Sequence, residues 1–262
     1  MTIRAIITAG GNPRGQRYWK NHLGRPKHLV QMPPGGETLL QRTVRLLREN
    51  GVEDVLIVGP EFDPPGLPGG LGYEIEGARI YRKPNPPVER QIHFRHADRY
   101  MPREIWNTEG RTLFLPGDMY FARQTLIDML AYDPDTWVMY MRLKSTRWPR
   151  RHKLGLKRTR MVLGFGFPPH EHELIANAIE TLTAMQRDPD NPVDRSLGLD
   201  IYRFLQGQTP EQLSRAGSTD PALWTAVEPH AWEPPLESPD IDFDTPETYG
   251  AFMMHYVPAL HD

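Results

Sequence analysis

The stretch that decides the fold reads IRAIITAGG at residues 3–11, TLLQRTVRLLRENG at residues 38–51 and DVLIV at residues 54–58. The first piece begins with a short apolar run, and the third piece is such a run. Both are rich in β-branched residues, which is the pattern of buried parallel strands. The middle piece has one apolar helical face and ends in a glycine, as a helix does. That face consists of Leu40, Val44 and Leu47. Strand, helix and strand in this order form a βαβ unit and predict a parallel sheet covered by helices.

The remaining chain continues this alternation of strands and helices. We expect strands at Thr112–Leu115, Thr136–Met141 and Met161–Phe167, and helices at Val88–Tyr100, at Glu171–Gln186 and from near Pro246. Residues 59–87 are rich in Pro and Gly and are expected to run over the surface, while residues 194–240 should hold two short helices and a long loop. We see no repeat or linker. The sequence therefore predicts one α/β domain over residues 1–262, a three-layer α/β/α sandwich with a mostly parallel mixed sheet.

The composition excludes several classes of function. The chain has 262 residues and a net charge of −2, so its bulk charge gives no reason to expect nucleic-acid binding. It contains no cysteine, which excludes disulfides, thiolate metal sites and thiol nucleophiles and leaves oxygen and histidine as metal ligands. No apolar run reaches the length of a membrane span. We expect a soluble, cytoplasmic protein with no membrane partner.

A glycine-rich, basic loop follows the first predicted strand. It reads AGGNPRGQRYWKNHLGR at residues 9–25 and is followed by Pro26 and Lys27. Glycines let backbone N–H groups approach phosphate oxygens, and basic side chains offset the phosphate charge. The loop contains neither a Walker A sequence nor the dinucleotide fingerprint GxGxxG. It predicts an anion-binding site, and a plain tight turn is the alternative interpretation.

This loop resembles the opening of the GT-A-type nucleotidyltransferases, which include the sugar-phosphate nucleotidyltransferases and the MobA-like enzymes. Residues 9–11 (AGG) match the start of the family signature, and Gly15-Gln16-Arg17 stands for its Gly-Thr-Arg after a two-residue insertion. Pro26 and Lys27 follow Arg17 at the spacing of the family's Pro-Lys. The predicted helix that ends in Gly51-Val52 continues the match.

The resemblance implies a Rossmann-like GT-A fold, with a nucleotide-binding half over about residues 1–120 and an acceptor half over about residues 121–262. Arg17 and Lys27 would be the catalytic cations that grip the triphosphate. Asn85, in PNPPVERQ, lies where relatives read the base or the sugar. The nucleotide-binding residues that the resemblance implies are Ala9, Gly10, Gly11, Asn12, Gly15 and Asn85.

Two acidic segments complete the resemblance. Asp118 follows the predicted strand TLFL and a Pro-Gly pair, at the carboxyl end of a strand where ligands of open α/β sheets gather. Asp242 and Asp244 lie in DIDFDTPE at residues 240–247, which resembles the segment that closes many relatives. By resemblance, Asp118 and one of these two would hold Mg²⁺ or Mn²⁺. A turn at Asp118, and a helix start capped by Thr245, are the structural alternatives.

We therefore expect a Mg²⁺-dependent nucleotidyltransferase that moves a nucleotidyl group from an NTP to a phosphorylated small-molecule acceptor, for example a sugar 1-phosphate, with release of pyrophosphate. A GT-A-fold glycosyltransferase that uses a nucleotide-sugar, and could act on modified nucleic acid, is the alternative. A catalytically silent nucleotide-binding module is a third. The basic run at residues 142–160 is a solvated loop, a clamp for a phosphorylated acceptor or a contact to nucleic acid.

Overall fold

The computed structural model of the chain describes residues 2–9, 27–32, 36–60, 75–83, 101–142, 161–187, 197–209, 212–213, 230–232, 234, 241–242 and 252. The chain divides into two compact units, each built from segments that are distant in sequence. Unit 1 consists of Met1–Ile3, Pro86–Phe114 and Pro134–Leu236, and unit 2 of Arg4–Asn85, Leu115–Asp133 and Glu237–Asp262. The predicted single domain, with halves that meet near residue 120, stays a prediction.

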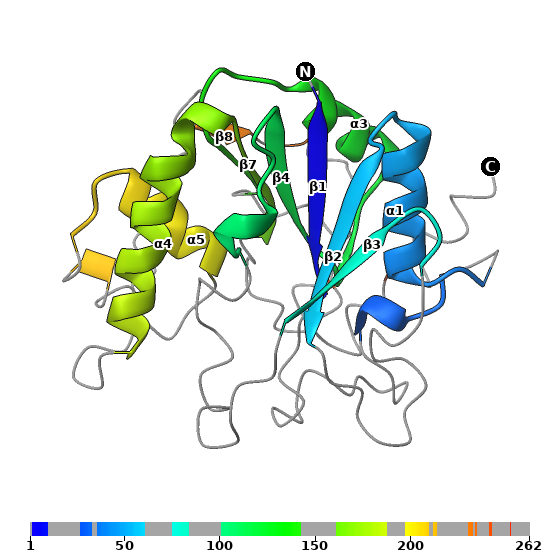
Figure 1. The fold of residues 1–262 in the computed structure, drawn as a ribbon. Helices are drawn as coiled ribbons and strands as arrows, with labels where there is room; N and C mark the ends of the chain where they lie inside the picture. The colour runs from blue at the N-terminus through cyan, green and yellow to red at the C-terminus, as the bar shows by residue number, and fades with distance from the viewer. Residues whose placement is uncertain are drawn as a thin grey trace. The chain divides into compact units, whose positions relative to one another are not determined.

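Strands and helices are interspersed along the chain (Figure 1). The helices are η1 (Lys27–Leu29), α1 (Leu39–Glu49), η3 (Arg103–Ile105), α3 (Arg123–Ala131), η5 (Pro169–Glu171), α4 (His172–Arg187) and α5 (Leu197–Leu205), where η marks a 3-10 helix. The strands are β1 (Ile3–Thr8), β2 (Asp54–Pro60), β3 (Arg79–Lys83), β4 (Arg111–Pro116), β5 (Met119–Tyr120), β6 (Val138–Arg142), β7 (Met161–Phe167), β8 (Ala231–Trp232) and β9 (Ile241–Asp242).

Seven strands form one mixed sheet in the order β3-β2-β1-β4-β7-β6-β8, and β5 and β9 form a separate pair. Strand β2 runs parallel to both β1 and β3, and β6 runs parallel to β8. Strand β7 is antiparallel to both β4 and β6. The predicted α/β class with a mixed, mostly parallel sheet is confirmed.

The βαβ unit that the sequence predicted lies in unit 2. The apolar side chains of β1 and β2 are buried, and so is the predicted apolar face of α1. Helix α1 begins with a capping box, in which the Thr38 hydroxyl accepts a hydrogen bond from the Gln41 backbone N–H at 3.2 Å and the Gln41 side-chain oxygen accepts one from the Thr38 N–H at 2.8 Å. The helix ends before Gly51, which adopts a φ of 82° that disfavours other residues.

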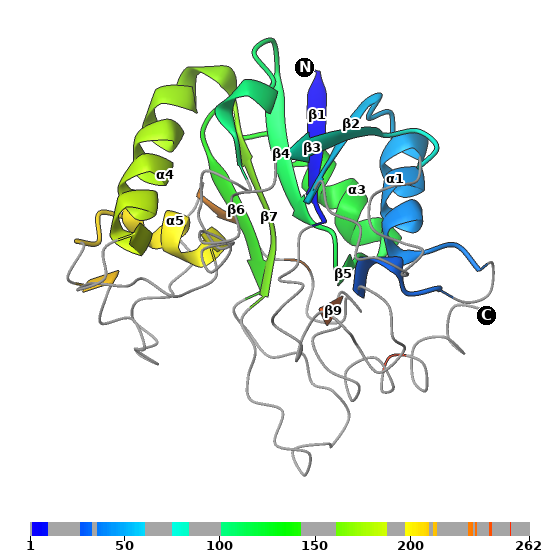
Figure 2. The ribbon, with the colours of Figure 1, turned by 60° about the horizontal axis from the view of Figure 1, so that its bottom comes forward.

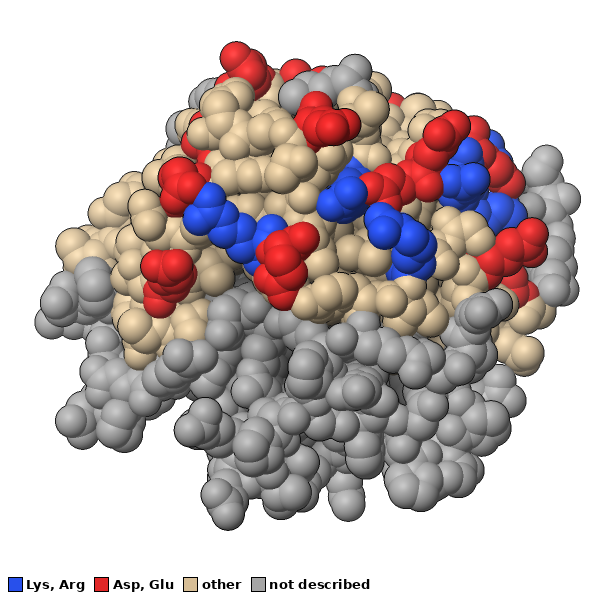
Figure 3. Space-filling model, in the orientation of Figure 1, with Lys and Arg blue, Asp and Glu red and all other residues tan. Residues whose placement is uncertain are grey.

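A carboxylate links β1, β2 and β3 near their amino ends. Asp54 opens β2 and is the register partner of Arg4 on β1. Its two oxygens accept hydrogen bonds of 2.6 Å from Arg4 and from Arg79 on β3. Burial alone would raise the pKa of Asp54, but the two guanidinium groups lower it below its usual range. Figure 3 shows acidic and basic side chains next to one another at several places on the described part of this face.

Unit 1 is built around an aromatic cluster between its strands and α4. The Trp106 ring lies edge-on to Phe167 of β7, with 5.0 Å between the ring centroids. The ring of His172, the first residue of α4, contacts both, at 5.2 Å from Trp106 and 5.6 Å from Phe167. Burial lowers the pKa of His172, and repulsion by the nearby Arg103 guanidinium lowers it further. This cluster joins the start of α4 to the sheet.

Most predicted elements are present among the described residues. Strands β4 and β7 and helix α4 confirm their predictions within one or two residues. The strand predicted from Thr136 begins at Val138, where the pairing with β7 begins. The helix predicted at Val88–Tyr100 lies outside the described residues, and of the helix expected from near Pro246 only Phe252 is described.

Two regions differ from the predictions. Residues 59–87 were expected to run over the surface, but Arg79–Lys83 forms β3 against β2. Residues 194–240 were expected to hold two short helices and a long loop. They contain α5 and further helical residues at 212–213, but also the strand β8, which adds to β6 through a hydrogen bond of 2.9 Å from Met139 N–H to the His230 carbonyl. Both strands lie at sheet edges and form by pairing with distant segments. Among the described residues, no helix is long and apolar enough to cross a membrane.

Candidate active site

The carboxyl end of β1 lies against the turn that carries Asp118, within unit 2. The Gly117 N–H donates a 3.0 Å hydrogen bond to the Thr8 carbonyl, and the Thr8 hydroxyl donates one of 3.3 Å to the Leu115 carbonyl. A Cβ at Gly117 would lie 3.0 Å from the Thr8 carbonyl oxygen and 3.2 Å from Ala9 Cα. Only glycine allows this approach without a shift. Ala9, where the glycine-rich loop begins, is therefore placed beside the residue that precedes Asp118.

The pairing of β5 with β9 brings the two acidic segments together. Met119, which follows Asp118, is the register partner of Asp242, and Tyr120 is the partner of Ile241. Figure 2 shows the two short strands side by side. Asp118 itself is partly exposed in a turn, so the turn that the sequence offered as an alternative is present as well. Two carboxylate-bearing segments that are far apart in the chain thus meet next to the end of β1, while their role as metal ligands stays a prediction.

Lys27 lies in the short helix η1, whose continuation is tied to the start of α1. The Leu39 N–H donates a 2.9 Å hydrogen bond to the Val30 carbonyl, and the Met32 N–H donates one of 2.8 Å to the Glu37 carbonyl. Val30 and its neighbours toward Lys27 are buried. The backbone at Lys27 is therefore held by the same helix that covers β1 and β2.

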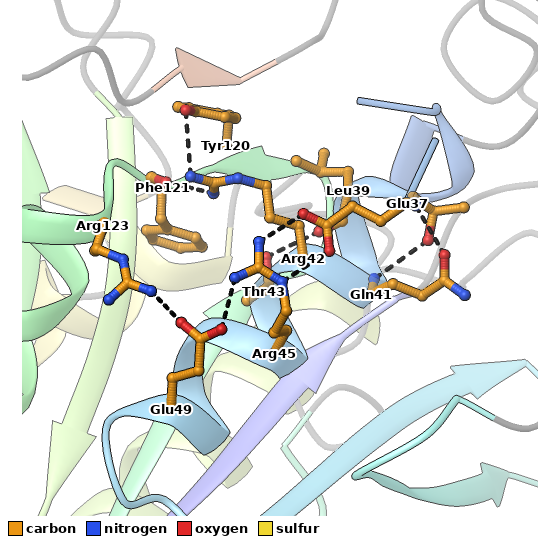
Figure 4. Close-up of polar contacts among 11 residues, drawn as sticks. Glu37, Leu39, Gln41, Arg42, Thr43, Arg45, Glu49, Tyr120, Phe121 and Arg123 are labelled. Carbon is orange, nitrogen blue, oxygen red and sulfur yellow. Dashed lines mark hydrogen bonds and ion pairs between the residues drawn. The ribbon is translucent and has the colours of Figure 1, made fainter. Parts of the chain in front are cut away.

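Arg42 of α1 reaches from the helix to the residues just after Asp118 (Figure 4). Its Nη1 donates a 2.7 Å hydrogen bond to the Phe121 carbonyl, and its Nη2 donates one of 3.2 Å to the Tyr120 hydroxyl. Its Cζ lies 4.2 Å from the centroid of the Tyr120 ring, within the range of a cation–π contact. The buried Tyr120 ring also contacts Phe252 at 4.5 Å. Sequence reasoning missed Arg42, because nothing in its local pattern distinguishes it from the other arginines of α1.

Those other charged groups of α1 form a network on the surface. Arg45 contacts Glu37 and Glu49 at 2.6 Å and 2.8 Å, and Arg123 of α3 also contacts Glu49 (Figure 4). The hydrogen bond from Arg45 lowers the pKa of Glu49, and the two glutamates raise the pKa of Arg45. Ion pairs this exposed contribute little to stability, because water and salt screen the charges.

Several predicted site residues lie outside the described part of the chain. They are Gly10, Gly11, Asn12, Gly15, Arg17, Asn85 and Asp244, together with residues 143–160 of the basic run. Their assigned roles stay predictions, as do those of Ala9, Lys27, Asp118 and Asp242. Within the described residues, no three His, Asp or Glu side chains gather in a group that could hold a metal ion.

Comparison with known proteins shows the family of the chain. Residues 5–187, more than half of the chain, match the family described as the MobA-like NTP transferase domain. The chain belongs to this family. It is a nucleotidyltransferase, and its match includes Ala9, Lys27 and Asp118 but ends before Asp242. The predicted family membership is confirmed. The match supports neither the alternative glycosyltransferase activity nor a nucleic-acid partner.

Solved structures show the same fold as this nucleotidyltransferase at low sequence identity. The CTP:phosphocholine cytidylyltransferase from Streptococcus pneumoniae is 14% identical, with a TM-score of 0.57 and coverage of 98% of this chain and 100% of that chain. A Bacillus anthracis protein provisionally assigned as a glucose-1-phosphate thymidylyltransferase is 13% identical, with a TM-score of 0.54 and coverage of 97% and 95%. The inositol-1-phosphate CTP transferase from T. maritima is 14% identical, with a TM-score of 0.51 and coverage of 94% and 91%. A comparison with curated proteins found no match.

Proposed function

We propose that this nucleotidyltransferase moves the nucleotidyl group of an NTP onto a phosphorylated small molecule, such as a sugar 1-phosphate, and releases pyrophosphate. The observation that carries the proposal is the meeting, within unit 2, of three segments at one place: the end of β1 at Ala9, the turn at Gly117–Asp118, and strand β9 with Asp242. A phosphate-binding loop beside two acidic segments suits a reaction between polyanions.

The chemistry asks little of the protein beyond placement and charge. An oxygen of the acceptor phosphate attacks the α-phosphorus of the NTP, and the bond from that phosphorus to the bridging oxygen breaks as pyrophosphate leaves. A phosphate oxygen is already a nucleophile, so no general base is required. Lys27 and Arg17 would offset the charge that develops on the triphosphate. Such electrostatic stabilisation of the transition state is usually the largest single contribution to catalysis.

We assign a divalent ion to the carboxylates of the two acidic segments. Asp118 and one of Asp242 and Asp244 would hold Mg²⁺ or Mn²⁺, both of which prefer oxygen ligands and need few from the protein. When bound, the ion would neutralise triphosphate oxygens and help to align the α-phosphorus for attack. The register of Met119 with Asp242 supports this assignment, because it holds the two acidic segments at neighbouring positions.

Pyrophosphate release tests the proposal. The purified chain is incubated with each common NTP and with a panel of phosphate monoesters that includes glucose 1-phosphate, phosphocholine and inositol 1-phosphate, the acceptors for which the structural neighbours are named. We expect pyrophosphate only when an NTP, an acceptor and Mg²⁺ are all present. Transfer or hydrolysis of nucleotide-sugars without pyrophosphate release would instead support the glycosyltransferase.

Lys27 provides the matching variant. Lys27→Ala should lose most of the activity and fold normally, since it removes a charge from the triphosphate site, and Lys27→Arg, which keeps the charge, should retain more activity than Lys27→Ala. Circular dichroism and the melting temperature establish the folding of both variants. Unchanged turnover in Lys27→Ala would contradict the assigned role.

A further inference from the structure

The Arg42 side chain joins α1 to the polypeptide that carries Asp118. Its two hydrogen bonds end on Phe121 and Tyr120, the third and second residues after Asp118, and its guanidinium lies against the Tyr120 ring. Tyr120 and Phe121 are both buried, at 2% and 0% exposure. Arg42 therefore contacts buried residues of unit 2, on the side of β5 that faces α1 (Figure 4).

The chemistry of this contact calls for arginine. A guanidinium is planar and always charged, and it can donate two hydrogen bonds while one face covers an aromatic ring. A lysine ammonium at the same place keeps the charge but lacks the planar fork that spans a carbonyl and a hydroxyl. Arg45, one turn further along α1, has partners of a different kind, since it pairs with the carboxylates of Glu37 and Glu49 at the surface.

The contact reaches both acidic segments through the backbone. Tyr120 and Met119 form β5, so a guanidinium that fixes Tyr120 and Phe121 also fixes the strand that begins directly after Asp118. The same two residues pair with Ile241 and Asp242. On the opposite side of the turn, the bond from Gly117 to Thr8 holds the chain against β1. Among the described residues, the Gly117 backbone and the Arg42 side chain thus anchor the chain on either side of Asp118.

We propose that Arg42 is a positioning residue of the nucleotidyl-transfer site, which holds β5 so that Asp118 and the β9 segment share one divalent ion. The inference rests on the proposed function, because it takes Asp118 as a ligand of that ion. Arg42 touches neither substrate nor metal in this role. It acts by keeping the carboxylate where the ion binds, as groups that orient metal ligands do in other sites.

The first test measures metal binding without catalysis. Binding of Mn²⁺ alone is followed by electron paramagnetic resonance for the wild type, Arg42→Met, Arg42→Lys, Tyr120→Phe and Asp118→Asn. We expect Arg42→Met to weaken Mn²⁺ binding about 10-fold, the lower end of what outer-shell substitutions do. Arg42→Lys should fall between Arg42→Met and the wild type, and Tyr120→Phe, which removes only the hydroxyl, should change least. Asp118→Asn should weaken binding more than any of these.

The second test separates positioning from general stability. Arg45→Met is the matched control, because it removes an arginine from the same helix together with two ion pairs. Pyrophosphate release should show kcat lowered about 10-fold to 100-fold in Arg42→Met at a fixed Mg²⁺ concentration. The KM for the NTP should stay within about twofold, since Arg42 is assigned no contact to the nucleotide. Arg45→Met should match the wild type in kcat, KM and Mn²⁺ binding.

The outcomes distinguish the inference from the proposed function. The positioning role would be overturned if Arg42→Met bound Mn²⁺ like the wild type, or if Arg45→Met lost as much Mn²⁺ affinity as Arg42→Met. It would also be overturned if the wild type bound no Mn²⁺ or if Asp118→Asn left the Mn²⁺ affinity unchanged. If no NTP and acceptor release pyrophosphate but the order of Mn²⁺ affinities holds, the proposed reaction fails, whereas the role of Arg42 in holding the ligands of the ion stands. If Arg42→Met does not fold, Arg42→Lys and Tyr120→Phe decide the question by their graded affinities.

Discussion

Replacing Gly117 by alanine should displace the turn that carries Asp118. The added Cβ would lie 3.0 Å from the Thr8 carbonyl oxygen, 3.2 Å from Ala9 Cα and 3.3 Å from Ala9 Cβ. Carbon atoms pack best at about 3.5–4.0 Å, so the turn and β1 must separate by a few tenths of an ångström. Neither side yields easily, because the atoms that collide belong to the backbone and to a Cβ.

The expected magnitudes follow from that displacement. Overpacking of a tight contact costs about 1–3 kcal/mol, and we expect Gly117→Ala to lose free energy of unfolding in this range. A misplacement of about 1 Å can lower a rate about 100-fold, so a shift of a few tenths should lower kcat roughly 10-fold. Urea unfolding measures the first quantity, and pyrophosphate release at saturating substrate measures the second.

Gly51→Ala is the control for stability alone. Gly51 has a φ of 82° and no atom within 4 Å of the point that a Cβ would occupy, so an alanine there meets backbone strain but no neighbour. The left-handed conformation costs a non-glycine residue about 1–2 kcal/mol, similar to the loss expected at Gly117. Gly51→Ala should therefore lose comparable stability and keep its kcat. Equal kcat values in the two variants, or wild-type stability and kcat in Gly117→Ala, would refute the reasoning.

Two further predictions concern stability. The pKa of His172 lies below its usual 6.5 in the folded protein, so the unfolded chain binds the proton first and the free energy of unfolding falls as the pH drops below about 6.5. Urea titrations at several pH values should show that His172→Phe removes this part of the acid sensitivity, and parallel pH profiles for the two proteins would contradict it. Thr38→Ala removes the capping bond to Gln41 and should lower the free energy of unfolding by about 0.5–2 kcal/mol in urea. Thr38→Ser keeps a hydroxyl and should stay near the wild type, and equal losses of stability in both variants would argue against the cap.

Local patterns predicted the elements whose own residues form a clear apolar run or a helical face. The apolar face of α1, its glycine stop and the runs of β1, β2 and β4 are visible in the printed sequence. A helix repeats every 3.6 residues, and a strand buried on both faces is a continuous apolar run. The family resemblance in the first sixty residues likewise depends on residues close in sequence, and the family match confirms it. These patterns do not predict which distant segment pairs with the strand at the edge of a sheet.

The sequence by itself determined the α/β class, the family and the candidate residues Ala9, Lys27 and Asp118. Only the tertiary structure decided that β5 pairs with β9, that Gly117 touches the end of β1, and that Arg42 holds Tyr120 and Phe121. The physical reason is that these contacts join residues far apart in the chain, where no periodicity or propensity relates one partner to the other. A two-residue strand such as β9 has no pattern of its own and exists through its partner.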